Sequence, residues 1–149
     1  MTSRSQTVDR DLITASAAET EAAGERLAQR LVPGDVVLLE GPLGSGKTTF
    51  VRGLARGLRV AGHVASPTFQ LVRVYEGEVP LAHADLYRLE DPASALADLG
   101  LEELVDRGVA VIEWGDRLSW PGAARVRFEE EGPERRRLRL LEAPATWTW

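Results

Sequence analysis

The chain has 149 residues, 44% of them hydrophobic and 28% charged, and its formal net charge is −5 at pH 7. This length suffices for one domain with a buried core, and the acidic balance argues against a protein whose main task is to coat nucleic acid. The chain has no cysteine, which excludes disulfides, thiolate metal sites and a cysteine nucleophile. Residues 1–11 lack the apolar stretch of a signal peptide, and no run approaches the roughly 18 apolar residues of a membrane span. We therefore expect a cytoplasmic protein with no membrane partner.

The first part of the chain predicts a helix followed by a buried strand. Residues 1–11 are polar, and we expect them to be flexible. Ser16 and Glu19 have the spacing of a capping box, which predicts a helix that begins at Ala17 and continues to Leu31. The run 36–39 is short and wholly apolar, as is typical of a buried parallel strand.

The second half of the chain predicts one more helix and several strands. A helical stretch should begin at Pro92, continue through Val105 and end at Gly108. The tail, residues 142–149, contains no clear element, and we expect it to be flexible. The further predicted strands cover residues 69–75, 79–86, 109–112, 125–130 and 136–141. This order predicts a single α/β domain over residues 1–149, with a sheet that contains both parallel and antiparallel strands.

The single lysine of the chain, Lys47, lies in a glycine-rich segment, and the other basic residues among the 18 are all arginine. Residues 41–48 read GPLGSGKT, the G-x-x-x-x-G-K-T spacing of a phosphate-binding P-loop, between the strand 36–39 and a predicted helix over 47–58. In such a loop the backbone N–H groups and the helix N-terminus attract phosphate oxygens. Lys47 would reach the outer phosphates and the Thr48 hydroxyl would ligate Mg²⁺. The expected architecture is therefore a three-layer sandwich of the P-loop NTPase kind.

The rest of the sequence narrows the choice of nucleotide. Without a second lysine the chain has neither the N-K-x-D segment with which common GTPases read guanine nor the third-strand lysine of eukaryotic-type protein kinases. ATP is thus favoured over GTP by elimination.

A magnesium ion in such a site also needs an acidic partner at the end of a neighbouring buried strand. Glu113 directly follows the predicted strand 109–112, and Asp85 lies near the end of the strand 79–86. Asp116 is a weaker third candidate in the loop after Glu113. The residues alone leave the choice between Glu113 and Asp85 open.

The motifs of the chain resemble, in order and spacing, those of the bacterial TsaE (YjeE) family. The matching segments are GPLGSGKTTF at 41–50, SPTFQLVRVY at 66–75, HADLYRL at 83–89 and IEW at 112–114. The resemblance implies an ATPase, weak alone and stimulated by its partners, that is needed to make threonylcarbamoyladenosine at position 37 of tRNA. It implies action with a TsaD–TsaB heterodimer, in which TsaD performs the transfer, so that tRNA is met only through the complex.

The resemblance also implies roles for individual residues. Thr48 and Glu113 match the Mg²⁺ ligands, and Asp85 matches the acidic residue implicated in hydrolysis. Thr68 resembles the switch-type threonine near the γ-phosphate, and Trp114 matches the tryptophan beside the site. The matching nucleotide loop consists of Gly41, Pro42, Leu43, Gly44, Ser45, Gly46, Lys47, Thr48 and Thr49.

The sequence departs from the family pattern at two positions. Gln70 stands where the family often has threonine, and Gly115 stands where it often has proline. We expect Gly115 to loosen the segment that holds Glu113 and Trp114.

Two other functions remain open from the sequence. A small-molecule kinase would need an arginine-rich lid, whereas the segment 92–108 is acidic and bears leucines. A binding module gated by ATP without useful turnover is the second alternative.

Several remaining side chains carry weaker expectations. His83 could orient Asp85 or be a satisfied strand histidine, and the second interpretation is favoured because an isolated histidine is not a functional signal. Trp147 and Trp149 are expected to dock on the body of the protein or on a partner. The arginines on the predicted helix 47–58 and just after it are expected to form a solvated face, and one of the later cluster could reach the nucleotide. These are Arg52, Arg56 and Arg59, and Arg135, Arg136, Arg137 and Arg139.

Overall fold

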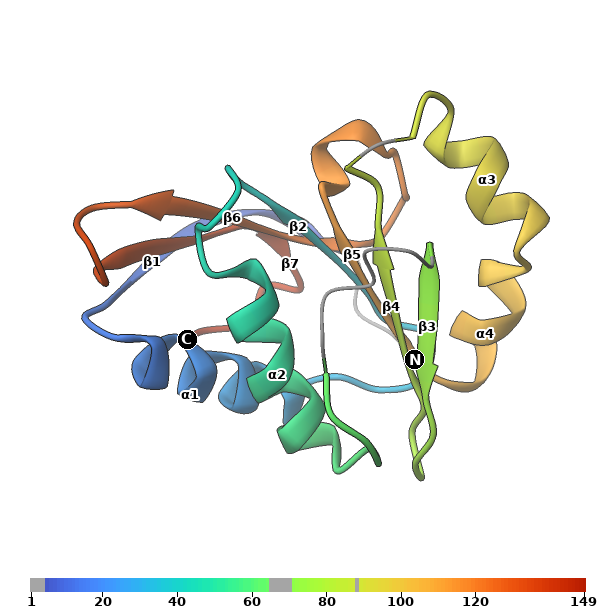
Figure 1. Cartoon of the computed structure of the whole chain (residues 1–149), viewed down its shortest axis with the longest axis horizontal. Coiled ribbons are helices and arrows are strands. Elements are labelled where there is room, and N and C mark those ends of the chain that lie inside the picture. Colours follow the sequence, from blue (N-terminus) through green and yellow to red (C-terminus); the bar gives the residue numbers. More distant parts are fainter. Residues whose placement is uncertain (1–4, 65–70, 88) are drawn as a thin grey trace.

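The computed structural model describes residues 5–64, 71–87 and 89–149. Within these ranges, seven strands form one mixed sheet in the order β1-β7-β6-β2-β5-β4-β3 (Figure 1). The four central strands β6, β2, β5 and β4 are parallel, while β7, β1 and β3 pair antiparallel at the two sides. The strands are β1 (Gln6–Thr14), β2 (Val36–Glu40), β3 (Val72–Tyr75), β4 (Leu81–Asp85), β5 (Val109–Glu113), β6 (Ala124–Glu130) and β7 (Arg136–Ala143).

Helices cover both faces of the sheet. Helices α1 (Ala17–Ala28) and α2 (Lys47–Leu58) lie together on one face, and α3 (Pro92–Asp98) and α4 (Leu101–Arg107) lie apart from them (Figure 1). A short 3-10 turn, η1 (Gly115–Arg117), follows β5. The three-layer α/β sandwich with a mixed sheet is therefore confirmed.

Strand β2 contributes to the packing on both faces. Its side chains Val37 and Leu39 belong to the apolar cluster with α1 and α2, while Val36 and Leu38 belong to the cluster with α3 and α4. This follows from the two-residue period of a strand, which sends successive side chains to opposite faces. The continuous apolar run is what a strand covered on both faces requires.

The start of helix α1 agrees with the capping prediction. Ser16 is the N-cap, and its hydroxyl accepts a hydrogen bond from the Glu19 N–H at 3.2 Å. The Glu19 carboxylate in turn accepts from the Ala15 N–H at 3.1 Å. The helix ends at Ala28, three residues before the predicted Leu31.

The N-terminal segment differs from the sequence-based expectation of a flexible residue range 1–11. Residues 6–14 form the edge strand β1, which pairs with β7. Two aspartates of β1 form ion pairs with arginines of β7. Asp11 pairs with Arg137 at 3.1 Å, and Asp9 pairs with Arg139 at 3.3 Å. These partners lie 126 and 130 residues away along the chain, so local sequence gives no indication of them.

The C-terminal segment also differs from the flexible tail expected over 142–149. Strand β7 continues to Ala143, and Trp147 is buried. The Trp149 indole N–H donates to the Arg10 carbonyl at 3.0 Å, and its ring meets Phe50 of α2 edge-on at 6.1 Å. The two tryptophans thus dock on the body of the protein, one of the two outcomes expected for them.

The predicted helical stretch from Pro92 to Val105 is divided in two. Helix α3 ends at Asp98, and α4 begins at Leu101 after Gly100, which has a left-handed φ of +68°. A left-handed residue cannot continue a right-handed helix, so glycine at this position ends one helix and begins the next. No helix in the described part of the chain is long and apolar enough to cross a membrane.

Candidate functional site

The glycine-rich loop follows β2 at the carboxyl end of the central parallel strands, where ligands bind in open α/β sheets. Three of its glycines, Gly41, Gly44 and Gly46, have φ values of +143°, +74° and +101°. Side chains with a Cβ rarely adopt such angles, so glycine lets the loop turn its N–H groups inward. Helix α2 begins at Lys47, which directs its N-terminus at the same space.

Two arginines, one from β6 and one from β7, fix the position of the loop. The Arg127 guanidinium pairs with the buried Glu40, the last residue of β2, at 2.8 Å. Arg136 donates to the Gly44 carbonyl at 3.1 Å. That carbonyl is thereby bound from outside the loop.

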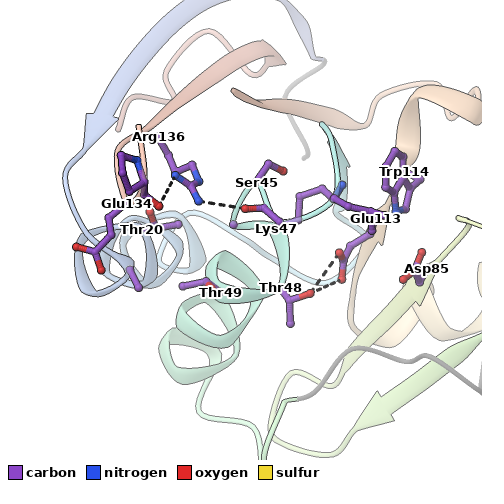
Figure 2. A pocket seen from close by; sticks show the side chains of 15 residues that line it. Thr20, Ser45, Lys47, Thr48, Thr49, Asp85, Glu113, Trp114, Glu134 and Arg136 are labelled. Carbon is purple, nitrogen blue, oxygen red and sulfur yellow. Dashed lines mark hydrogen bonds between the residues drawn. The ribbon is translucent and has the colours of Figure 1, made fainter. Parts of the chain in front are cut away.

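The loop forms one wall of an elongated cavity of about 380 Å³. Figure 2 shows Glu113, Asp85 and Trp114 at one end, the loop and the start of α2 in the middle, and Thr20, Glu134 and Arg136 at the other end. The lining residues are Ala17, Thr20, Leu43, Gly44, Ser45, Gly46, Lys47, Thr48, Thr49, Asp85, Glu113, Trp114, Pro133, Glu134 and Arg136. The cavity has the size of a small-molecule site.

The Lys47 ammonium is buried and folded back over the loop. It donates to the carbonyls of Gly41 and of Pro42, the latter at 3.2 Å. It also lies 3.6 Å from the centroid of the Trp114 ring, a cation–π contact. Burial lowers the pKa of Lys47, and the charges of Glu113, Asp85 and Asp116 oppose that shift. A buried ammonium held by neutral groups is poised to exchange these partners for phosphate oxygens.

Two acidic residues lie side by side in the same cavity as Lys47. Asp85 of β4 and Glu113 of β5 are register partners at the carboxyl ends of parallel strands. The Thr48 hydroxyl lies 3.4 Å from Oε1 and 3.3 Å from Oε2 of Glu113. Both distances are long for a hydroxyl hydrogen bond, so Thr48 and Glu113 are adjacent without being tightly bound to one another.

Burial raises the pKa of Asp85 above its usual value, and the charge of Glu113 adds to the shift. The Tyr87 N–H, which donates to Asp85 Oδ1 at 3.0 Å, and the charge of Lys47 act in the opposite direction. A carboxyl group with a raised pKa in a cavity is a better proton acceptor than an ordinary aspartate.

His83 is a buried strand histidine with a hydrogen-bond partner, as the favoured interpretation expects, and that partner is Glu113 of the site. Its ring is fully buried, and Nε2 lies 2.5 Å from Glu113 Oε2. Sequence reasoning missed the pair because it joins diagonal neighbours on two strands that are 30 residues apart in the chain.

The segment after Glu113 is held firmly, contrary to the expectation that Gly115 would loosen it. A Cβ on Gly115 would lie 2.5 Å from the Cβ of Leu38, so only glycine allows this close approach to β2. Arg125 donates to the carbonyls of Gly115 and Leu118 at 3.2 and 2.9 Å. Trp114, in a left-handed conformation with φ of +63°, is thereby directed at Lys47.

The oxygen groups present fit a magnesium ion better than a closed protein metal cage. Thr48 and Glu113 offer a hydroxyl and a carboxylate, the hard oxygen ligands that Mg²⁺ prefers. Among the described residues no group of three or more His, Cys, Asp or Glu could enclose an ion. A magnesium ion here would therefore need further oxygens from a phosphate ligand, as is usual for Mg²⁺ in nucleotide sites.

The remaining predicted site residues lie as follows. Gly41 and Pro42 do not line the cavity but supply the carbonyls that hold Lys47, whereas Leu43 to Thr49 all line it. Thr68 lies outside the described residues. Asp116 is exposed and does not line the cavity.

Sequence reasoning did not place one end of the cavity. Ala17 and Thr20 come from α1, and Pro133 and Glu134 come from the turn between β6 and β7. The sequence contains one indication of this end of the cavity, a polar residue, Thr20, on the face of α1 that is buried. In the structure the Thr20 hydroxyl lies 2.7 Å from that of Thr14.

The two arginines of α2, Arg52 and Arg56, are exposed, as expected of a solvated face. Arg56 pairs with Glu21 at 3.2 Å and with Glu25 at 2.9 Å on α1. Its charge is therefore used within the molecule.

Comparison with known proteins connects this site to one family. Residues 14–138 match the family model described as threonylcarbamoyl adenosine biosynthesis protein TsaE. The chain is 46% identical over 103 residues to a Bacillus subtilis protein and 44% identical over 108 residues to one from Treponema pallidum, both named tRNA threonylcarbamoyladenosine biosynthesis protein TsaE. These matches cover 68% and 72% of this chain, and 63% and 79% of the respective relatives. The chain therefore spans less than two thirds of the B. subtilis relative.

The fold of the chain has a solved counterpart. The crystal structure of YdiB from Bacillus subtilis is similar with a TM-score of 0.74 and 30% identity, over 93% of this chain and 88% of that one. With a family model that matches most of its length and relatives at these identities, the chain belongs to the TsaE family.

Proposed function

We propose that this chain is a P-loop ATPase that serves the formation of threonylcarbamoyladenosine in tRNA. The observation that carries the proposal is the single cavity in which Lys47, Thr48, Asp85 and Glu113 meet beside a loop of glycines with positive φ. The names of the relatives supply the pathway. The proposal places the protein in the cytoplasm, where tRNA is modified.

The proposed binding mode follows from the shape of the cavity. The phosphates would lie on the loop N–H groups and the N-terminus of α2, with the γ-phosphate toward Glu113 and Asp85. The nucleoside would extend to the other end, between α1 and the β6–β7 turn, where Thr20, Glu134 and Arg136 lie. Lys47 would leave the carbonyls of Gly41 and Pro42 and bind the outer phosphate oxygens.

The proposed chemistry is attack of water on the γ-phosphate. Thr48 and Glu113 would hold the Mg²⁺, which when bound neutralises charge on the phosphate oxygens. Lys47 and the loop N–H groups stabilise the charge that develops there. Asp85 would position the water or accept its proton, and Thr68 is proposed to act near the γ-phosphate. Trp114 sets the resting position of the Lys47 ammonium.

We further propose that turnover depends on the TsaD–TsaB heterodimer, with tRNA met only through that complex. In the structure Lys47 is bound to groups of its own chain, so low activity of the isolated protein is expected. A small-molecule kinase is less well supported because no described residue of α3 or α4 lines the cavity as a lid would.

The test is phosphate release from ATP with Mg²⁺, for the protein alone and with purified TsaD–TsaB added. Stimulation by the pair that is absent in Lys47→Ala would support the proposal. ATP binding without turnover in either condition would instead indicate a binding module gated by ATP. Phosphorylation of an added small acceptor would indicate a kinase.

A further inference from the structure

We propose that His83 is a positioning residue that fixes the Glu113 carboxylate as a metal ligand before nucleotide arrives. The inference rests on the proposed function, since it concerns the magnesium that a bound nucleotide would bring. His83 would not touch substrate or metal and would act only through Glu113.

The first observation is the strength of the contact. His83 Nε2 lies 2.5 Å from Glu113 Oε2, whereas the Thr48 hydroxyl lies 3.3 and 3.4 Å from the two carboxylate oxygens. A hydrogen bond weakens steeply as it lengthens. Among the residues that the structure describes, His83 is therefore the main anchor of Glu113, and Thr48 is left available for another partner.

The second observation is burial. The side chains of His83 and Glu113 are 0% and 5% exposed. A buried carboxylate without a hydrogen-bond donor is strongly disfavoured, and His83 supplies that donor from one side. The other side of Glu113 faces the cavity.

The third observation identifies the form of the imidazole. A carboxylate can only accept, so Nε2 must carry the proton of the pair. Nδ1 is buried and has no hydrogen-bond partner among the residues that the structure describes. A second proton there would be an orphaned donor, which is costly in a protein interior, so the neutral ring with its proton on Nε2 fits the site.

A neutral donor is chemically suited to this role. An arginine or lysine would cancel the negative charge of Glu113 and weaken its attraction for a cation. An imidazole N–H orients the carboxylate and leaves its charge in place. Hydrogen bonds from outer-shell groups orient the ligands of many metal sites in this way.

The experiment measures how much Mg²⁺ strengthens ADP binding, by titration calorimetry with Mg²⁺ and with EDTA. His83→Leu removes the donor, and His83→Gln keeps an N–H near the Nε2 position. His63→Gln is the matched control, since His63 is the other of the two histidines and is exposed. Thermal unfolding of each variant reports its folding.

We expect His83→Leu to weaken metal binding to the ADP complex by about 10–100-fold, the usual effect of removing such a partner. ADP affinity in EDTA should stay within about twofold, because neutral outer-shell changes leave the phosphate contacts intact. His83→Gln should recover most of the metal affinity, and His63→Gln should match the wild type. Electron paramagnetic resonance of Mn²⁺ with the ADP complexes gives a second reading of the same affinities.

Wild-type metal affinity in a folded His83→Leu would overturn the inference, as would a folded His83→Gln that is as impaired as His83→Leu. If His83→Leu unfolds, His83→Asn takes its place with the same expected loss, because its shorter amide lies near Nδ1. If Mg²⁺ gives the wild-type protein no gain in ADP affinity, the proposed function is overturned as well. The wild-type result therefore distinguishes a failure of the proposed function from a failure of the inference about His83 alone. ¹⁵N shifts of the His83 ring that show the proton on Nδ1 would contradict the assigned tautomer.

Discussion

Asp85 lies where a proton acceptor for the attacking water would be needed, beside Glu113 and close to Lys47. The substitution Asp85→Asn keeps the size of the side chain and the acceptor for the Tyr87 N–H while it removes the charge. We expect ATP affinity within a few-fold of wild type and partner-stimulated hydrolysis reduced by roughly 10²–10⁴-fold, the usual contribution of a general base. Calorimetry and phosphate release measure the two effects. Lost ATP binding would make Asp85 a ligand rather than a catalyst.

The raised pKa of Asp85 has a consequence for folding stability. The folded state holds the proton of this carboxyl group more tightly than the unfolded chain, whose pKa is near the usual 3.8. The stabilisation is therefore present below that value and is lost as pH rises through the higher pKa of the folded state. Wild type should lose stability relative to Asp85→Asn as pH rises above the usual 3.8 of an aspartate. Denaturant unfolding of both proteins across this rise in pH checks the sign, and a difference that moves the opposite way would show a lowered pKa instead.

At the scale of elements, the turn after β5 depends on its close packing against β2. Gly115→Ala would place a methyl group 2.5 Å from the Cβ of Leu38. Because β2 is central, the backbone has little freedom to yield, and we expect a loss of about 1–3 kcal/mol in the free energy of unfolding. Gly132→Ala is the control, since its Cβ would meet only Arg135 at an ordinary 3.5 Å. Equal stability of the two variants would mean that η1 moves freely.

The link between the β6–β7 hairpin and the glycine loop is a second feature at this scale. Arg136→Ala removes the donor to the Gly44 carbonyl. We expect ATP affinity to fall by about 5–10-fold, equivalent to ~1–1.4 kcal/mol for one such hydrogen bond. Arg135→Ala is the matched control, because the neighbouring Arg135 is exposed and does not line the cavity. An unchanged affinity in Arg136→Ala would show that the loop holds its shape without this contact.

At the scale of the whole molecule, the parts that sequence predicted are those with local patterns. The glycine loop, helix α2 and the buried strands β2 and β5 each carry their information within a dozen residues. Strand β1 does not, because its alternate charges are matched only by arginines on β7. The division of the 92–107 stretch depends on the left-handed Gly100, which a periodic run of leucines conceals.

The candidate site likewise contains some residues that local sequence could predict and others that it could not. Lys47, Thr48, Asp85 and Glu113 could be named from motif and strand ends, and they line one cavity. His83 could not be assigned, since its role depends on which strand lies beside β4. Thr20 and Glu134 were missed because the end of the cavity that they line is assembled from α1 and a distant hairpin.

The position of β2 between two parallel neighbours, with side chains in both apolar clusters, also determines how its backbone amides exchange with solvent deuterium. Val37, Leu38 and Leu39 are fully buried, and exposing their N–H groups requires both clusters to open together. Their hydrogen exchange should thus be among the slowest in the chain and should report the global free energy of unfolding. Saturating ATP should slow it further by the free energy of binding, RT ln(1 + [L]/Kd). Exchange at these amides faster than in α4 would show that the two faces of the sheet unfold separately.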